Sequence, residues 1–375
     1  MKKVLFLINT LCGGGAEKVL VDTVNSLDRE KYQITVQTLY DVGVFRDQLA
    51  PHIRYKTIIS IENNLLRKIV GKLLFCILNV KWVYNLFVRD TYDYEIAFLE
   101  GMPTKILSHS TNHNANKIAW VHTDLLAFPD SVYAFGTEEK EGQAYSCFDK
   151  VFCVSNAVQE AFEKKYGRYN QHIQTLYNII DDKSICNAGK EDVELPTNIH
   201  PCMISVGRLT QQKGFDRLLR IHKKLIDEGY LHSLLILGDG DKRAELEKYI
   251  KENGLSKSAF LLGFQKNPHK YMSKANLFVC SSYAEGFSMV ISESVLCGTP
   301  VISTAVSGAK EPLLAPRCSV IVDNEEKALY EALRSVLENP ACLERYKNDL
   351  CQKQKFLQKE FLVAKFEESV FSGEN

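Results

Sequence analysis

The sequence predicts an α/β protein made of two doubly wound parallel-sheet domains. The first observation behind this prediction is length, because 375 residues exceed the roughly 100–200 residues of one typical domain. The second is that short apolar runs alternate with helical patterns almost from end to end, as in parallel sheets covered by helices on both faces. The third is a single polar interruption, residues 187–201, which we interpret as the linker between the domains.

The N-terminal domain is expected to span residues 1–186 and to begin with a buried strand that enters a glycine turn. Helical periodicity predicts helices that include 16–27 and 157–166. The apolar runs between the helical patterns predict strands at 3–8, 33–39, 55–59, 94–99, 117–122, 151–155 and 173–178.

The C-terminal domain is expected to span residues 202–351. Its apolar runs predict strands at 203–207, 233–237, 260–262, 277–280, 300–303 and 319–322, and its helical patterns include 215–228, 242–253 and 288–296. The last segment, 352–375, is helical in pattern and has no strand after it. We therefore expect it to pack across the domain junction.

Composition excludes several classes of protein. A hydrophobic fraction of 45% and a charged fraction of 25% are ordinary for a globular chain and rule out intrinsic disorder. The 46 basic and 46 acidic residues are also balanced within each half, so neither half has the basic excess of a nucleic-acid-binding domain. The eleven cysteines form no Cys-x-x-Cys pair, and we interpret them as reduced thiols that pack as small apolar side chains. No metal site is expected.

The first predicted strand leads into a glycine-rich turn, residues 13–15, that opens a helix. Backbone N–H groups and the positive end of the helix dipole at such a turn can face an anion or a sugar hydroxyl. The turn is no dinucleotide fingerprint, because Lys18 stands where the third glycine of Gly-x-Gly-x-x-Gly would fall. The alternative is that the glycines serve only the backbone geometry of a tight turn.

Two cations follow the first strand of the second domain. Arg208 and Lys213 lie five residues apart in a turn that precedes a helix. An arginine can bind two phosphate oxygens at once and a lysine supplies a compact charge, so this pair can neutralise a diphosphate without a metal. A solvated surface turn is the alternative interpretation.

Two carboxylates follow the strand at 277–280. Glu285 lies in the loop, and Glu293 lies on the next helix, with Ser288 as a candidate N-cap. If the chain from Glu285 to Glu293 is helical, its rise over eight residue steps is about 12 Å, beyond the roughly 5–9.5 Å between the paired carboxyls of a glycosidase. We therefore expect the two carboxylates to contact two parts of one long ligand, with a purely structural role for either as the alternative.

Although the net charge is zero, positive charge is concentrated in one segment of the chain. No acidic residue occurs between Glu62 and Asp90, whereas basic residues alternate with apolar and aromatic ones from Leu65 to Arg89. A basic helix with an apolar face can lie in a membrane interface, and a buried helical pair with a solvated basic edge is the alternative. No uninterrupted run of about 18 apolar residues is present, so no membrane-spanning helix is expected.

Together and in this order, these segments resemble the family-4 (group 1) retaining glycosyltransferases of GT-B fold. The resemblance covers nearly the whole chain, is strongest across 203–312 and weakest across 40–95, and rests on residues 13–17, 207–214, 285–293 and 307–311. It implies two Rossmann-like domains that face an interdomain cleft. The N-terminal domain would bind the acceptor, and the C-terminal domain would bind a nucleotide-sugar, usually a UDP-sugar. Lys310 before Glu311 departs from the family's pattern.

The resemblance also implies roles for individual residues. Arg208 and Lys213 would hold the diphosphate, Glu285 would contact the donor sugar, and Glu293 would bind the ribose hydroxyls. His122 takes the place of the family's active-site histidine, so the expected catalytic set is Glu285, His122, Lys213 and Arg208. The further implied contacts are Gly263 and Phe264 at the base, the backbone of Gly286, Phe287 and Ser288 at the diphosphate, and Gly14, Gly15 and Glu100 on the acceptor side.

The expected reaction moves a hexosyl or N-acetylhexosaminyl unit from a nucleotide-sugar to a hydroxyl of a glycan acceptor, without a bound cofactor or metal. Acceptors in this family are often lipid-linked, so a polyprenyl-diphosphate-linked glycan and the inner face of the cytoplasmic membrane are the expected partners of a cytoplasmic, peripheral enzyme. A GT-B-fold sugar-nucleotide epimerase, a phosphorylase and a catalytically silent binding subunit stay open as alternatives.

Overall fold

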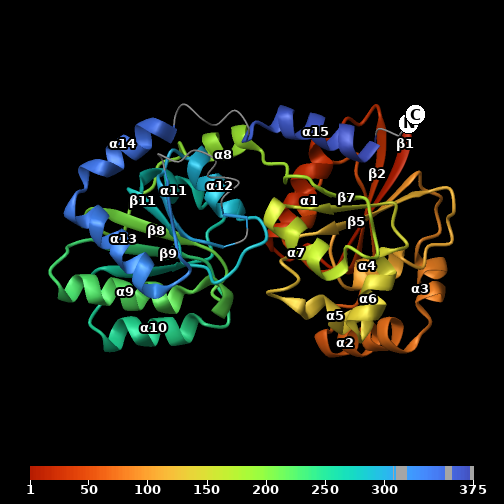
Figure 1. Cartoon of the computed structure of the whole chain (residues 1–375), viewed down its shortest axis with the longest axis horizontal. Coiled ribbons are helices and arrows are strands. Elements are labelled where there is room, and N and C mark those ends of the chain that lie inside the picture. The colour runs from red at the N-terminus through yellow and green to blue at the C-terminus, as the bar shows by residue number, and fades with distance from the viewer. Residues whose placement is uncertain (307, 310–318, 351–356, 372–375) are drawn as a thin grey trace. The chain divides into compact units, whose positions relative to one another are not determined.

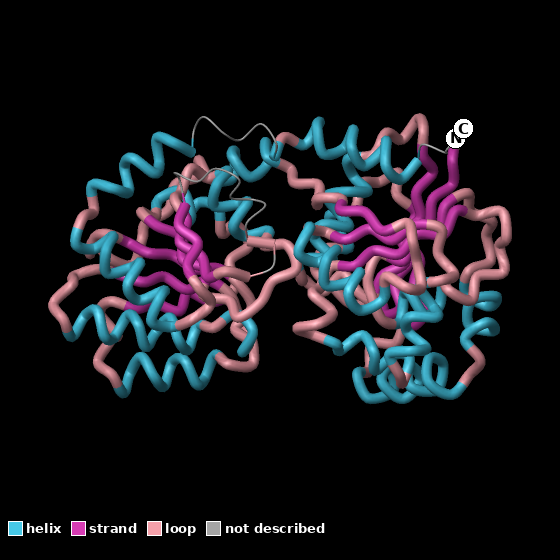
Figure 2. Tube along the Cα trace, viewed as in Figure 1, coloured by secondary structure: helices cyan, strands magenta, loops and turns pink. Residues whose placement is uncertain are grey.

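The structure of the chain is a computed structural model that describes residues 1–306, 308–309, 319–350 and 357–371. The chain divides into two compact units. The N-terminal unit consists of Met1–Ile180 together with Leu362–Asn375, and the C-terminal unit consists of Asp181–Phe361 (Figure 1). Each unit contains its own parallel sheet with helices on both sides (Figure 2).

The sheet of the N-terminal unit has the strand order β3-β2-β1-β4-β5-β6-β7. Its interior strand β1 is fully buried from Val4 to Ile8, as expected for a strand that is covered on both faces. The strands are β1 (Lys2–Ile8), β2 (Tyr32–Tyr40), β3 (Arg54–Ile59), β4 (Tyr94–Ala97), β5 (Asn116–Val121), β6 (Lys150–Cys153) and β7 (Ile173–Thr175).

One helix of this unit begins at a clear capping signal. Ser155 caps α7 (Asn156–Tyr166) by accepting a hydrogen bond of 3.1 Å from the N–H of Val158. Helix α15 (Lys359–Phe371) ends the described chain, and its Phe366 stacks on Trp120 of β5 with ring centroids 5.4 Å apart. The remaining helices are α1 (Gly15–Ser26), α2 (Asn64–Lys72), α3 (Val80–Phe87), α4 (Met102–Leu107), α5 (Val132–Phe135) and α6 (Glu138–Tyr145).

The sheet of the C-terminal unit has the order β10-β9-β8-β11-β12-β13. The strands are β8 (Cys202–Val206), β9 (Ser233–Leu237), β10 (Ala259–Gly263), β11 (Leu277–Cys280), β12 (Val301–Thr304) and β13 (Ser319–Val322). The helices are α8 (Asp182–Ala188), α9 (Phe215–Asp227), α10 (Arg243–Glu252), α11 (His269–Lys274), α12 (Met289–Leu296), α13 (Glu326–Glu338) and α14 (Ala341–Leu350). Helix α9 buries Leu218, Leu219 and Leu225 in the core of this unit.

The predicted fold class is confirmed. Every expected strand is present with bounds that differ by three residues or fewer, and the five internal helices named from the sequence differ by one residue at most. Buried parallel strands are continuous apolar runs, and amphipathic helices have a period of 3.6 residues, so both are visible locally. Residues 352–356 of the expected C-terminal helix lie outside the described residues.

The polar stretch 187–201, expected to link the domains, lies within the C-terminal unit. The two units divide between Ile180 and Asp181, six residues before the expected end of the first domain. The start of the stretch is bound to this unit, since Asn267 donates to the Ala188 carbonyl at 3.0 Å and Ser273 donates to the Gly189 carbonyl at 2.6 Å. The polar stretch 187–201 is therefore bound through its backbone to the C-terminal unit.

Helices α2 and α3, joined by a π-helical turn (Leu73–Ile77), carry an exposed apolar face. Tyr84 fixes α3 to the sheet by donating a hydrogen bond of 2.7 Å to buried Glu95 of β4. No single helix of the described chain is long and apolar enough to cross a membrane, although the bent pair Asn64–Phe75 and Val80–Phe87 meets both conditions together. The apolar side chains that remain exposed are Leu65, Leu66, Ile69, Leu73, Ile77, Leu78, Trp82 and Leu86.

The cysteines only partly follow the prediction that they pack in the core. Cys153, Cys202 and Cys280 are buried, whereas Cys12 and Cys147 are exposed. The described cysteines are free thiols, and no group of three or more His, Cys, Asp or Glu side chains in the described residues is arranged to hold a metal ion.

Candidate functional site

In each sheet, most of the candidate site residues follow the two strands between which the chain reverses its direction of winding, whereas His122 follows β5 and Gly263 and Phe264 lie at the end of β10. The two reversal strands are β1 and β4 in the N-terminal unit and β8 and β11 in the C-terminal unit. The loops after two such strands turn to opposite faces of the sheet and leave a crevice at its carboxyl edge, where ligands of doubly wound proteins bind. The topology therefore places the turn at 207–214 beside the loop at 281–288.

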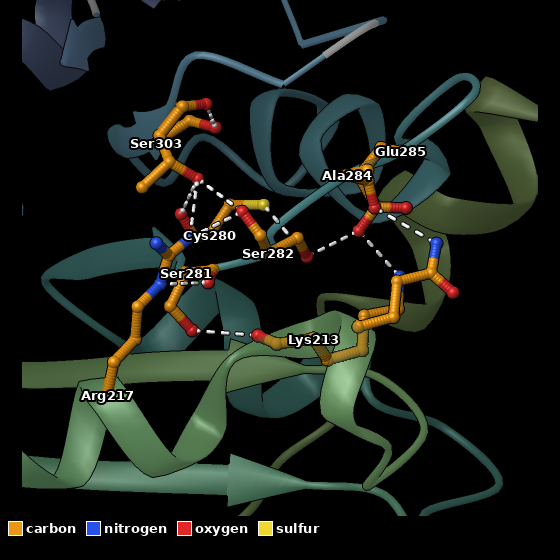
Figure 3. A network of polar contacts seen from close by, with 10 residues as sticks. Lys213, Arg217, Cys280, Ser281, Ser282, Ala284, Glu285 and Ser303 are labelled. Atoms are coloured by element: carbon orange, nitrogen blue, oxygen red, sulfur yellow. Dashed lines mark hydrogen bonds and ion pairs between the residues drawn. The ribbon is translucent and has the colours of Figure 1, made fainter. Parts of the chain in front are cut away.

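Lys213 and Glu285, expected from the sequence to contact one donor, are in direct contact. Lys213 Nζ lies 2.6 Å from Glu285 Oε1, and the hydroxyl of Ser282 donates to the same oxygen at 2.5 Å (Figure 3). The two charged side chains are only 18% and 9% exposed. A charge pair so far removed from water interacts more strongly than a pair on the surface, so each group controls the position of the other.

The turn that carries Lys213 is joined to the loop that carries Glu285 along its backbone. Ser281 donates to the Lys213 carbonyl at 3.0 Å, the Tyr283 N–H donates to the Gln212 carbonyl at 2.8 Å, and the Gln212 amide donates to the Ala284 carbonyl at 3.0 Å. The two segments, about 70 residues apart in sequence, therefore form one structural element.

Gly214 allows this close approach. It has a positive φ of 63°, and a Cβ atom there would lie 2.1 Å from the Ser281 carbonyl oxygen. Any side chain would therefore push the Lys213 turn away from the Glu285 loop.

Arg208 occupies a different environment from Lys213. It follows β8, is exposed, and forms no ion pair with another described residue. The second expected cation is therefore present at the same strand end, with its charge available to a ligand.

Glu293 lies on α12 with 16% of its side chain exposed. The Nε2 atom of His269, at the start of α11, lies 3.5 Å from Glu293 Oε2 and makes no hydrogen bond with the described residues. His269 was not singled out by the sequence, because nothing local connects it with a carboxylate 24 residues later.

The start of α12 differs from the expectation in two ways. The helix begins at Met289, so only part of the chain between Glu285 and Glu293 is helical, and the estimate of about 12 Å from helix rise does not apply. Ser288 is the N-cap residue, but its hydroxyl does not cap the helix and, although 1% exposed, has no partner among the described residues. A buried, unpaired hydroxyl is costly unless a ligand pairs with it.

Gly308 lies against the loop that precedes α12. A Cβ atom at Gly308 would lie 2.0 Å from the Gly286 carbonyl oxygen, so the segment that follows β12 supports the backbone at 286–288. Ser307, Lys310 and Glu311, which contributed to the resemblance, lie outside the described residues.

The residues expected at the base lie at the end of β10, two strands from β8 and so about 10 Å away at the usual strand spacing. Gly263 has a φ of 70° and accepts a hydrogen bond from the Gly238 N–H, and Phe264 is 65% exposed. A cavity of about 580 Å³ adjoins this loop and is lined by Leu262, Gln265, Tyr271 and residues 194–198.

In the N-terminal unit the structure brings two of the expected residues together. Glu100 follows β4, His122 follows β5, and the backbone N–H of His122 donates to Glu100 Oε2 at 3.1 Å. Burial lowers the pKa of His122 to about 3, so its ring is neutral at physiological pH, and its Nε2 has no partner among the described residues. Burial also raises the pKa of the Glu100 carboxyl. Gly14 is the N-cap residue of α1, and Gly15 begins that helix.

Sequence reasoning missed Arg217, which donates to two carbonyls of the Glu285 loop, and Ser282, whose hydroxyl donates to the Glu285 carboxylate. Arg217 falls in a strongly amphipathic helical pattern, where an arginine is expected on the solvent side. Ser282 left a weak signal, because a serine three residues before a carboxylate can bond to it across a tight turn.

Two doubly wound parallel-sheet units in one chain, of seven and six strands, fit the GT-B class of α/β proteins. HepE of Anabaena, in complex with UDP and glucose, has this fold, with a TM-score of 0.76, 21% identity and full coverage of both chains. TarM, for which a Staphylococcus aureus complex with UDP is also known, matches with a TM-score of 0.75, 12% identity and 99% of both chains. These likenesses establish the fold.

Sequence comparison identifies the family. The profile of Glycosyltransferase Family 4 matches residues 13–184, and that of Glycosyl transferases group 1 matches residues 192–352. The chain therefore belongs to the group 1, family-4-like glycosyltransferases.

Two curated relatives share part of the chain. An N-acetylgalactosamine-N,N'-diacetylbacillosaminyl-diphospho-undecaprenol 4-alpha-N-acetylgalactosaminyltransferase of Campylobacter jejuni is 35% identical over 206 residues, 54% of this chain and 55% of that protein. The lipopolysaccharide core biosynthesis glycosyltransferase LpsD of Rhizobium meliloti is 26% identical over 178 residues, 47% and 50% of the two chains. The chain thus spans about half the length of the curated relatives it matches.

Proposed function

We propose that this protein is a retaining glycosyltransferase that moves a hexosyl or N-acetylhexosaminyl unit from a UDP-sugar to a hydroxyl of a lipid-linked glycan in the synthesis of a surface polysaccharide. The observation that carries the proposal is the partly buried Lys213–Glu285 pair beside exposed Arg208 at the reversal point of the C-terminal sheet. Membership of the family and the UDP complexes of proteins with the same fold support it.

On the donor side, Arg208 and Lys213 bind the diphosphate, and the backbone N–H groups at the start of α12 with the hydroxyl of Ser288 complete its environment. The buried and unpaired state of that hydroxyl supports this role. Glu285 then exchanges part of its contact with Lys213 for a hydroxyl of the donor sugar, while Glu293 accepts hydrogen bonds from the ribose. Gly263 and Phe264 contact the base.

The reaction that we propose is a same-face transfer. The bond between the anomeric carbon and the diphosphate oxygen breaks, the acceptor oxygen bonds to the same face of that carbon, and the leaving diphosphate takes the acceptor's proton. Charge grows on the diphosphate during this step, so the two cations stabilise the transition state without a metal or cofactor. An α-glycoside formed from an α-linked donor retains its configuration, and the α-linkage in the Campylobacter relative's name supports this choice.

On the acceptor side, we assign the glycan to the N-terminal unit, where the glycine turn at Gly14 and Gly15, Glu100 and neutral His122 lie at the ends of neighbouring strands. The relatives named for a diphospho-undecaprenol substrate and for lipopolysaccharide core synthesis support an acceptor of this kind. A cytoplasmic enzyme at the inner face of the membrane would meet such an acceptor.

A panel of UDP- and GDP-sugars, incubated with and without a polyprenyl-diphosphate-linked glycan, tests this function. We expect UDP to be released from a UDP-sugar in the presence of the acceptor, with the rate unchanged by EDTA. Release that needs no acceptor and yields no glycoside would indicate an epimerase, a requirement for phosphate would indicate a phosphorylase, and no release from any donor would indicate a silent binding subunit.

We also propose that the exposed apolar face of α2 and α3, with the basic residues around it, binds an anionic lipid surface. Eight large apolar side chains lie exposed on a segment that Tyr84 anchors to the sheet. None of the basic residues in this segment forms an ion pair with a described residue: Arg67, Lys68, Lys72, Lys81 and Arg89. An anionic membrane interface buries apolar side chains and attracts basic ones, so a surface that exposes both is expected to bind there.

The double substitution Trp82→Glu and Leu86→Glu tests this surface. We expect it to lower the affinity for phosphatidylglycerol vesicles by about 100-fold or more, because burying each side chain contributes at least about 1.5 kcal/mol. Leu231→Glu, at a residue 74% exposed in the C-terminal unit, is the matched control and should leave binding unchanged. Co-sedimentation measures binding; equal binding of wild type to phosphatidylcholine and phosphatidylglycerol, or none to either, would rule out the proposed surface.

A further inference from the structure

Arg217 is a buried arginine that the proposed donor contacts do not use. It lies in the first turn of α9, four residues after Lys213, and is only 1% exposed. It forms no ion pair with any carboxylate among the described residues. A charged group is rarely placed out of water without a carboxylate, so its remaining partners must explain its position.

Those partners are backbone carbonyls at the end of β11. Arg217 Nε donates to the Ser281 carbonyl at 2.7 Å, and its Nη2 donates to the Ser282 carbonyl at 2.6 Å (Figure 3). The same Nη2 donates to the side-chain oxygen of Asn324 at 2.8 Å. The guanidinium carbon also lies 4.0 Å from the ring centroid of Tyr283. Three consecutive residues of the loop are thus held by one side chain.

Only an arginine can make this set of contacts from one position. Its guanidinium group is planar and presents five donors in a fixed fork, so it can satisfy two neighbouring carbonyls while its face packs on an aromatic ring. Hydrogen bonds from a charged donor are roughly twice as strong as neutral ones. The segment 281–283 is therefore fixed more firmly than an ordinary loop after a strand.

The fixed segment lies directly between the two catalytic side chains. Ser281 bonds to the Lys213 carbonyl, and Ser282 bonds to the Glu285 carboxylate. Arg217 lies four residues after Lys213 in the chain. Its side chain therefore links the Lys213 turn to the backbone at 281–282, and Ser282 links that backbone to Glu285.

We propose that Arg217 is a positioning residue, which fixes the backbone at 281–283 so that Lys213 and Glu285 present their charges to one donor at the correct separation. This inference rests on the proposed function of that pair. In this proposal, the buried Arg217 on α9 controls the geometry of the donor site without contacting the donor.

The test is Arg217→Lys, which keeps the charge and loses the fork. We expect kcat for UDP release, with the donor that the panel identifies, to fall by about 100-fold, as a small misplacement of catalytic groups does. The dissociation constant for UDP, measured by calorimetry, should change much less than kcat, because only the diphosphate contact of Lys213 is affected, while the contacts proposed for the base and ribose come from β10 and α12. A merely structural role would change both quantities together with the folded fraction.

Arg220→Lys is the matched control, since Arg220 lies one turn later on α9 and pairs at the surface with Asp216 and Glu326. It should leave kcat and the UDP dissociation constant unchanged. Asn324→Ala is a second variant at an exposed residue. Without altering the arginine, it removes one partner of Arg217 and also the hydrogen bond of 2.7 Å from Asn324 to the Tyr283 carbonyl. We expect it to lower kcat several-fold, so a failure of Arg217→Lys to fold would not leave the inference without a test.

Hydrogen exchange measured by mass spectrometry adds a readout that needs no substrate. In Arg217→Lys, amides in 281–288 should exchange at least about tenfold faster, while those in β9 should be unaffected. Wild-type kcat, or unchanged exchange in 281–288, would overturn the inference. If the wild-type protein releases UDP from no donor, the proposed function fails, and the exchange rates still decide whether Arg217 fixes this loop.

Discussion

Replacing Lys213 with alanine is expected to lower kcat by about 100- to 1,000-fold at saturating donor. The lysine is the partly buried cation of the Lys213–Glu285 pair. We propose that it stabilises the negative charge that develops on the leaving diphosphate. Loss of one preorganised donor to a developing oxyanion typically costs about 2.7–4 kcal/mol of transition-state stabilisation, which corresponds to this range.

The measurement is the rate of UDP release with the donor identified by the panel, corrected for the folded fraction from a melting curve. Lys248→Ala is the control, because Lys248 lies on α10 of the same unit and is 73% exposed with only a weak pair to Glu252. A value of kcat close to that of the wild type would remove Lys213 from the catalytic set. A higher KM with an unchanged kcat would assign to it ground-state binding alone.

Breaking the Lys213–Glu285 pair from one side is expected to destabilise the C-terminal unit more than removing both charges. Lys213→Met leaves the Glu285 carboxylate, at 8% exposure, with the Ser282 hydroxyl as its remaining described partner. An uncompensated charge in a buried pair costs on the order of 3 kcal/mol, whereas two apolar side chains of similar size can be nearly neutral. The double variant Lys213→Met with Glu285→Leu should therefore lose less than the sum of the single changes, by about 1–3 kcal/mol.

Calorimetric melting of the four proteins of this cycle measures the coupling. The Arg220–Glu326 pair provides the control cycle, because its N···O distance is 2.8 Å but its side chains are 42% and 45% exposed. Water and salt screen such a pair, so its coupling should stay below about 1 kcal/mol. Equal couplings in the two cycles would show that burial does not strengthen the Lys213–Glu285 interaction.

The fold was predictable because its signals are local. Each buried parallel strand is a short apolar run, such as residues 277–280, and each internal helix has its own period and end signals, such as Gly298 with a φ of 76° after α12. The polar stretch 187–201 lies within the C-terminal unit, where Asn267 and Ser273 bond to its backbone, and polar composition alone does not record such contacts.

The sequence predicted candidate site residues only where they lie in short motifs that follow a predicted strand. Arg208, Lys213, Glu285 and Glu293 were found in this way, and the structure adds that two of them are bound to each other. Ser288 was expected to cap its helix, but its hydroxyl makes no capping hydrogen bond and has no partner among the described residues.

The sequence by itself determined that this protein has two doubly wound units and belongs to the glycosyltransferases, since strand, helix and motif signals extend over a few residues each. Only the tertiary structure decided which partners the charges have. Arg217 and Lys213 contact Ser281 and Glu285 across more than 60 residues of chain, because parallel pairing of β8 with β11 brings the two strand ends together. No periodicity or spacing within either segment records that pairing, since β9 and β10 lie between β8 and β11 in the chain and the two strands become neighbours only in the assembled sheet.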